Sequence, residues 1–270
     1  MKRLLYLNRN DYFSTSKGEK IVNFLKDKVN LKKSVVLDIG CNVGAISIPF
    51  SKKVKEVYSC DLNRKPLNVL SRKIKEENIK NISILRINAV KIPLGDSSID
   101  IAIINGVLEW TPLGNTGNPR EVQLRVLKEV KRVLKKNGML YLGIENRYFI
   151  GYFLGRKDNH TNLRFVPFLP RFLANVYSKV ISGKEYRNYL YGKFGYKKIL
   201  REAGFKEVDF YTAIPTYSFP ESIIKINDIN GIKKASNYFK NKLLRLGIKL
   251  LASLHLYWLF GHSFVMLAKP

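Results

Sequence analysis

Short apolar runs alternate with stretches of helical periodicity through the first half of the chain. Each run is rich in Val, Ile or Leu and is bounded by Gly, Asn or Asp, which is typical of buried strands. We predict strands at residues 35–38, 57–61, 82–88, 99–105 and 139–145. This order of elements favours a parallel sheet with helices on both of its faces.

Two stretches between these runs carry apolar residues at the spacing of a helix face. We predict helices at residues 65–77 and 121–134. Asn137 and Gly138 are expected to end the second helix, because both residue types accept the left-handed conformation that is common at helix C-termini.

The second half of the chain has a different pattern. Aromatic and basic residues crowd the segment at about 147–200, which we interpret as an insertion after the fifth strand. Strand-like runs return at 208–214 and 263–268, and a basic helical stretch at about 231–260 separates them.

The domain organisation follows from this pattern. Residues 1–33 are predicted as an N-terminal helical lead-in, and residues 34–270 as one elaborated domain. The chain has 270 residues, 46% of them hydrophobic and 26% charged, which is the composition of a globular protein with a real core.

A strand, a glycine-punctuated turn and a helix beginning near Ala45 follow one another at residues 35–45. Glycine lets the backbone approach a ligand closely, and Asn42 is the kind of non-glycine residue that tolerates a positive φ. Asp61 stands about 20 residues after Gly40, at the end of the next predicted strand, where an acid can accept hydrogen bonds from ribose hydroxyls. The pattern predicts a nucleotide-binding turn.

Four blocks in this order resemble the class I S-adenosylmethionine-dependent methyltransferases, a broad group that includes ubiquinone-biosynthesis and sugar-modifying enzymes. The blocks are residues 37–44, 58–63, 88–94 and 96–109, and Asn42 departs from the commoner glycine. A nicotinamide-binding Rossmann domain fits less well, because it would place glycine where Asn42 and Ala45 stand.

The resemblance implies a Rossmann-like α/β fold with a seven-stranded, mostly parallel sheet and an antiparallel last strand. It also implies S-adenosyl-L-methionine as the cofactor and the segment at about 147–200 as the acceptor-binding insertion. The residues assigned to the cofactor are Asp38, Gly40, Cys41, Asn42, Gly44, Asp61, Leu62, Asn88, Ala89 and Asn105.

Three residues are predicted to act in catalysis, because ligands of open α/β sheets bind beyond the carboxyl ends of the strands. Glu109 follows the fourth predicted strand, and Glu145 ends the fifth. His160 lies in the polar loop after it and is the leading general base, with Asp158 close enough to orient its ring. The alternatives are a structural loop histidine and, for Glu109, a helix cap or a ligand of the methionine amino group. No metal ligands are predicted.

The formal net charge of +27 implies attraction to polyanions such as nucleic acid or an anionic membrane, unless it reflects only a lysine-rich proteome. Lys242, Arg245 and Lys249 share one helical face, and we expect Leu243, Leu246, Leu250 and Leu254 to lie opposite. This distribution indicates either an interfacial helix or an ordinary amphipathic helix packed on the sheet. The apolar run is too short to span a bilayer, which takes about 20 residues.

These features predict an enzyme that O-methylates a saccharide, lipid-linked or small-molecule acceptor. The alternatives are an RNA methyltransferase and, less favoured, a non-catalytic regulatory subunit that binds the cofactor. The chain has two cysteines, without disulfide or zinc spacing, and no apolar secretory signal, so we expect a cytoplasmic protein. The helical stretch at 231–260 adds the expectation of peripheral binding to the inner membrane face.

Overall fold

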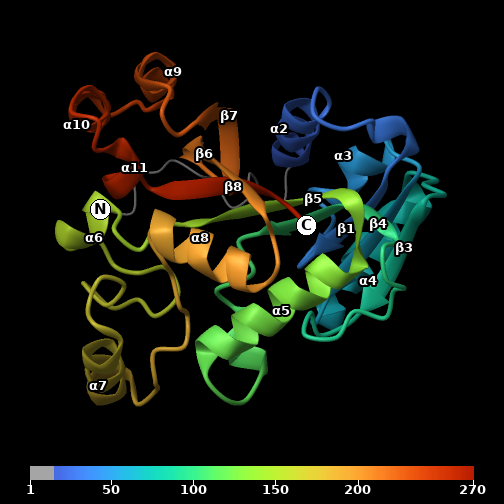
Figure 1. The fold of residues 1–270 in the computed structure, drawn as a ribbon, viewed down its shortest axis with the longest axis horizontal. Helices are drawn as coiled ribbons and strands as arrows, with labels where there is room; N and C mark the ends of the chain where they lie inside the picture. The colour runs from blue at the N-terminus through green and yellow to red at the C-terminus, as the bar shows by residue number, and fades with distance from the viewer. Residues whose placement is uncertain (1–14) are drawn as a thin grey trace.

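A computed structural model describes residues 15–270, and its centre is one eight-stranded sheet (Figure 1). The strands in spatial order are β3 (Ile82–Arg86), β2 (Glu56–Asp61), β1 (Val35–Ile39), β4 (Ile99–Asn105), β5 (Leu134–Glu145), β8 (Ser263–Lys269), β6 (Glu207–Thr216) and β7 (Phe219–Lys225). Strands β1 to β5 are mutually parallel, whereas β8 is antiparallel to both β5 and β6. The predicted fold class, including the antiparallel last strand, is confirmed.

The sheet has one strand more than the seven expected. Strand β7 pairs antiparallel with β6 at the sheet edge, after a turn at Tyr217 and Ser218. Its sequence includes Pro220, which lacks an amide proton and is tolerated in edge strands but not in central ones. The apolar alternation of β7 is therefore weak, and the sequence pattern did not reveal this strand.

Helices cover both faces of the sheet. Alternate residues of β4 separate the two cores: Ala102 and Ile104 belong to one hydrophobic cluster, and Ile101 and Ile103 belong to the other. The helical elements up to the fifth strand are α2 (Ser16–Leu25), η1 (Leu31–Lys33), α3 (Ser47–Ser51), α4 (Arg64–Glu76), η2 (Thr111–Gly114) and α5 (Pro119–Val133). Helix α5 contributes to the first core, and α2 contributes to the second.

The expected end of the second predicted helix is wrong. Helix α5 stops at Val133, and Leu134 already has extended backbone angles. The amides of Ser97 and Ser98 donate to the carbonyl oxygens of Arg132 and Val133, so the last turn of the helix is satisfied from a neighbouring loop. A left-handed cap at Asn137 and Gly138 is therefore not needed, and both residues lie in an irregular first part of β5.

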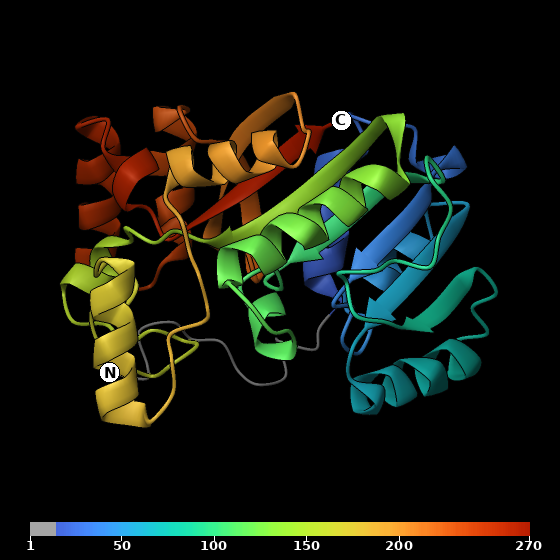
Figure 2. The same cartoon turned by 60° about the horizontal axis from the view of Figure 1, so that its bottom comes forward.

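The later helical elements are α6 (Ile150–Phe153), α7 (Arg171–Ser182), α8 (Lys193–Glu202), α9 (Ile229–Ala235), η3 (Ser236–Tyr238), α10 (Lys242–Ser253) and α11 (Tyr257–Phe260). Helix α8 packs on the sheet, because Tyr196, Ile199 and Leu200 lie in the first core. Helices α6, α7 and α10 lie at the end of the molecule remote from β3 (Figures 1 and 2), where α10 packs on the same core through Ile248 and Ala252. Within residues 15–270, every helix is too short or too polar to cross a membrane.

Candidate active site

The turn after β1 has the backbone that the glycine pattern predicts. Gly40, Asn42 and Gly44 all have positive φ, at 73°, 51° and 85°. The amides of Gly40 and Cys41 both donate to the carbonyl oxygen of Cys60, at 2.7 and 2.9 Å. The turn is thereby fixed against the end of β2, at the carboxyl edge of the sheet.

Asp61 lies directly beside this turn. Its Oδ2 accepts a hydrogen bond from the amide of Asn42 at 3.1 Å, and its Oδ1 accepts one from the amide of Asn63 at 2.8 Å. These contacts hold the carboxylate at the end of β2, next to Leu62, which is half exposed. This is the place where a ribose would meet an acid in a nucleotide-binding sheet.

Asp38 differs from the other predicted cofactor residues because it is buried beneath the turn. Its Oδ2 accepts a hydrogen bond of 2.6 Å from the hydroxyl of Ser47, and Ser47 in turn accepts one from Ser59. Burial raises the pKa of Asp38 to about 6, although the Ser47 hydrogen bond opposes the shift. The contacts show Asp38 as a support of the turn and of the start of α3.

The remaining predicted cofactor residues lie after β3 and β4. The side chain of Asn88 accepts from the amide of Val90 and donates to Asn115, and Ala89 packs against the core. Asn105 ends β4, and its Oδ1 is buried without a hydrogen-bond partner. Strands β3, β2, β1 and β4 are adjacent, so the fold brings these residues, the glycine turn and Asp61 to one edge.

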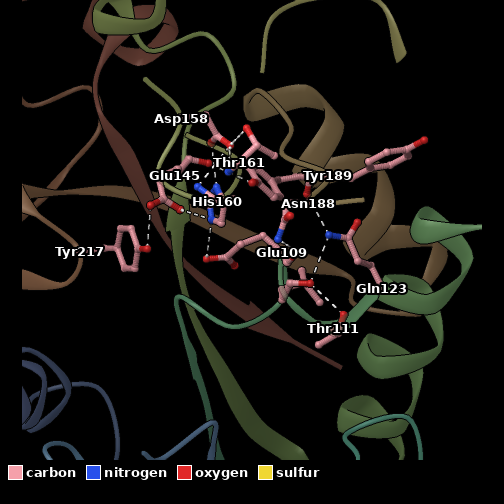
Figure 3. A network of polar contacts seen from close by, with 12 residues as sticks. Glu109, Thr111, Gln123, Glu145, Asp158, His160, Thr161, Asn188, Tyr189 and Tyr217 are labelled. Carbon is pink, nitrogen blue, oxygen red and sulfur yellow. Dashed lines mark hydrogen bonds and ion pairs between the residues drawn. The ribbon is translucent and has the colours of Figure 1, made fainter. Parts of the chain in front are cut away.

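The three predicted catalytic residues meet beyond the ends of β4 and β5 (Figure 3). The Nε2 atom of His160 lies 3.7 Å from Oε1 of Glu109 and 3.8 Å from Oε2 of Glu145. All three side chains are at least 95% buried. The structure thus joins residues that are far apart in the sequence into one cluster, which we call the Glu-His-Glu cluster.

Asp158 orients His160, as the sequence suggested. Its Oδ1 is 2.8 Å from Nδ1 of the ring, and its Oδ2 accepts from the amide of His160 and from both the amide and the hydroxyl of Thr161. Four contacts therefore fix this buried carboxylate. Trp110 covers the other side of the histidine, with 4.8 Å between the ring centroids.

Burial and charge act against each other in the Glu-His-Glu cluster. Burial, reinforced by the nearby Glu109 carboxylate, raises the pKa of Glu145 to about 7. Burial opposes protonation of His160, but Asp158 and the two glutamates outweigh it and raise the pKa of His160 to about 11. The pocket therefore favours a positive charge at the centre of the cluster.

Two supporting residues were not predicted. The Tyr217 hydroxyl donates to Oε1 of Glu145 at 3.0 Å, and Asn188 donates to the carbonyl oxygen of Glu109 at 3.0 Å. Tyr217 also packs at Gly106, where an added Cβ would come within 2.7 Å of its ring. Tyr217 lies in the β6–β7 turn and Asn188 in a loop, and neither has a spacing that would link it to the site.

The glycine turn, the acid at the end of the next strand and the buried acid-base cluster all lie at the carboxyl edge of the sheet, which is where Rossmann-like folds bind their ligands. Residues 37–142 match the family model described as "Methyltransferase domain". Residues 37–142 are therefore similar to the methyltransferase domain of S-adenosylmethionine-dependent enzymes, and the protein is a methyltransferase of this kind.

Similar proteins agree with this assignment. The demethylmenaquinone methyltransferase of a Geobacillus species is 26% identical over 198 residues, covering 71% of this chain and 78% of the relative. Among solved structures, a Pyrococcus horikoshii protein has a TM-score of 0.59 at 16% identity, covering 100% of this chain and 96% of its own. A methyltransferase from Aquifex aeolicus has a TM-score of 0.51 at 17% identity, with 96% and 95% covered. The two structures show the shared fold.

S-adenosylmethionine is the cofactor of this class, and the carboxyl edge of β1 to β4 fits it. The turn has the left-handed backbone of a nucleotide-binding turn, and among the described residues the Oδ1 atom of Asn105 is buried without a hydrogen-bond partner. Cys41 and Cys60 adjoin the turn, but burial raises the pKa of both thiols, which makes them inert packing residues.

Proposed function

We propose that this methyltransferase acts on a hydroxyl oxygen of a small-molecule acceptor, with the cofactor held by the predicted residues at the edge of β1 to β4. The observation that carries the proposal is the Glu-His-Glu cluster. It lies at the carboxyl ends of β4 and β5, next to the strand end that bears Asn105. Oxygen is a poor nucleophile until it loses its proton, and buried carboxylates beside an imidazole are suited to promote that loss.

The reaction is a single displacement. The acceptor O–H bond breaks and the proton passes to the cluster; Glu109 is the residue best placed, because neither of its carboxylate oxygens has a hydrogen-bond partner. The oxygen forms a bond to the methyl carbon as the sulfur–carbon bond breaks, which leaves methylated acceptor and S-adenosylhomocysteine. The protein contributes mainly orientation, with reacting atoms about 3–3.5 Å apart.

A lipid-linked or quinone-like acceptor is favoured by the surface of α10. Leu243, Leu246, Leu250 and Leu254 are 80%, 65%, 57% and 55% exposed, whereas Ile248 on another side of the helix is buried. Helix α10 packs on the first core through Ile248 and Ala252, so these four leucines are not its packing face. An exposed leucine stripe beside basic residues is the pattern of a helix that lies in a membrane interface.

Helix α7 presents a second apolar face at the same end of the molecule (Figures 1 and 2). Phe172, Val176 and Val180 follow one another at four-residue spacing and are 68%, 59% and 76% exposed. With the net charge of +27, both helices are suited to an anionic membrane surface. The relatives named as demethylmenaquinone methyltransferases support an acceptor of low polarity.

The test is the fate of a labelled methyl group. The protein is incubated with methyl-tritiated S-adenosylmethionine and, in separate reactions, with a membrane lipid extract, an aqueous metabolite extract and total RNA. We expect label in a lipid-extractable product. Label in the aqueous metabolites alone would show that the acceptor is water-soluble and not lipid-linked. Label in RNA alone would favour the RNA methyltransferase. Cofactor binding without label in any pool would favour the regulatory subunit.

A further inference from the structure

We infer that Glu109, Glu145 and His160 form a binding site for one divalent metal ion. Their potential ligand atoms are two carboxylate oxygens and one ring nitrogen, and all lie within 4.8 Å of one another. Figure 3 shows the three side chains directed toward a common point. Two oxygens and an imidazole nitrogen are a common ligand set for Mn²⁺, Fe²⁺ and Zn²⁺.

The distances from Nε2 of His160 to the two glutamate oxygens are better suited to a bound metal ion than to direct hydrogen bonds. A charge-assisted N–H···O hydrogen bond is about 2.7–2.9 Å long. The Nε2 atom of His160 is instead 3.7 and 3.8 Å from the two glutamate oxygens, although Asp158 approaches the other ring nitrogen to 2.8 Å. The wider spacing leaves room for an ion bonded to all three atoms at about 2.0–2.2 Å after a small contraction.

Unsatisfied oxygens give independent support. Glu109 is completely buried, and both of its carboxylate oxygens lack a hydrogen-bond partner, as does Oε2 of Glu145. Buried charges are otherwise paired or bound to metal. Among residues 15–270, His160 is the only basic side chain that lies within ion-pair distance of either glutamate. The single positive charge of one imidazolium cannot neutralise the carboxylates of Glu109, Glu145 and Asp158 together. The two positive charges of a divalent ion come closer to doing so.

Asp158 supplies the outer contact that metal-bound histidines usually have. A carboxylate that accepts the Nδ1 proton fixes the ring and directs the Nε2 lone pair toward the metal. Asp158 meets this requirement at 2.8 Å and is itself held by three backbone and side-chain donors. We therefore assign Asp158 as a positioning residue and the other three as ligands.

The role of the ion rests on the proposed function. Three protein ligands leave coordination positions open, as in catalytic rather than structural metal sites. An acceptor hydroxyl bound at an open position would lose its proton more readily, because the metal stabilises the oxyanion. The carboxylate oxygen of Glu109 or Glu145 that is not bound to the metal would accept that proton.

The experiment is a Mn²⁺ titration of the metal-stripped full chain, followed by electron paramagnetic resonance of the free ion. We expect one Mn²⁺ per chain and at least a 100-fold weaker affinity in Glu109→Gln and Glu145→Gln. Asp158→Asn should weaken binding by about 10- to 100-fold, as for other outer-contact residues. Glu207→Gln is the matched control, because Glu207 lies on an exposed surface paired with Lys269, and its affinity should equal that of the unchanged protein.

Thermal unfolding provides a second measurement that does not depend on turnover. Mn²⁺ should raise the melting temperature of the unchanged protein and of Glu207→Gln but not that of Glu109→Gln. The melting temperature of Glu109→Gln without metal is compared with that of the unchanged protein, so that loss of metal binding is distinguished from loss of folding. Absence of Mn²⁺ binding, or equal binding in the glutamine variants, overturns the metal site. Methyl transfer that survives chelator would leave the proposed function intact in that case.

Discussion

The cofactor edge and the Glu-His-Glu cluster are built in different ways, although they lie at the same side of one sheet. The cofactor edge consists of strand ends and of backbone in left-handed conformation, from Gly40 through Asp61 to Asn105. The cluster consists of side chains from a loop after β4, the end of β5 and a loop beyond it. A site that binds through its backbone needs glycines at fixed positions, and these can be recognised in the sequence. The cluster instead forms because the topology of the sheet brings distant residues together.

The difference also separates the expected effects of mutations. Changes at the cofactor edge should alter cofactor affinity and leave the chemistry of the bound complex nearly intact. Changes in the cluster should do the reverse, because none of its three residues belongs to the turn or to its hydrogen bonds. Each variant below acts on one of the two regions or on the exposed face of α10.

The largest effect is expected for His160→Ala. Removing a group that takes part in proton transfer should lower the turnover rate by about 100-fold or more, whether His160 acts directly or through a bound ion. Cofactor affinity should stay within about twofold, as checked by calorimetry beside the turnover assay. His255→Asn is the matched control, because His255 is exposed and has a positive φ that Asn tolerates. Full turnover in His160→Ala would make His160 a structural residue.

A smaller effect concerns stability beneath the cofactor edge. The folded state holds Asp38 at a pKa of about 6, above its ordinary 3.8, so the folded chain binds more protons between these values. Stability must therefore fall as pH rises from about 4 to 6. The shift corresponds to about 3 kcal/mol, and Asp38→Asn should recover about 2 kcal/mol of it at pH 7 after weakening of the Ser47 hydrogen bond.

Chemical denaturation at pH 5 and pH 7 tests this expectation. The advantage of Asp38→Asn over the unchanged protein should grow with pH and level off above about pH 7. The folded state should disfavour ionisation of the Asp38 carboxyl group. A stability advantage of Asp38→Asn that is equal at both pH values, or a loss of stability at pH 7, would contradict this assignment.

The smallest effect on folding stability is expected at the exposed leucines of α10. Replacing exposed Leu246 and Leu250 by Ser should change the free energy of unfolding by less than about 0.5 kcal/mol each. The double variant should bind anionic liposomes about tenfold more weakly, because apolar burial contributes to interfacial binding. Sedimentation in low and high salt checks this: the unchanged protein should stay partly bound in high salt. Complete release by salt would mean that charge alone attracts it.

The sequence predicted most of the cofactor half because its signals are local. Strand β4 lies at the predicted residues, and Gly40, Asn42 and Gly44 have the positive φ that the turn implied. It also identified all three residues of the Glu-His-Glu cluster, but only from their positions after strands. That Glu109 and Glu145 approach one histidine depends on the adjacency of β4 and β5.

The sequence missed features that arise from long-range packing. Tyr217 reaches Glu145 because β6 and β7 form a hairpin, and the Pro220 edge strand carries little alternation. A metal site was not predicted, because its ligands come from three separate segments without recognisable spacing. The solvent exposure of the α10 leucines likewise follows from how the helix packs, which its periodicity alone left open.

The central claim is that the cofactor edge, and not the Glu-His-Glu cluster, determines cofactor affinity. The most direct test is calorimetric titration of S-adenosylmethionine into the unchanged protein, Asp61→Ala and His160→Ala. Asp61 accepts a hydrogen bond from the amide of Asn42 and is the residue that we assign to the ribose hydroxyls, so its loss should weaken binding by about 1.5–3 kcal/mol. His160→Ala should bind with nearly unchanged affinity. Equal affinity in Asp61→Ala and the unchanged protein, or a larger loss in His160→Ala than in Asp61→Ala, would contradict the assignment of the two regions.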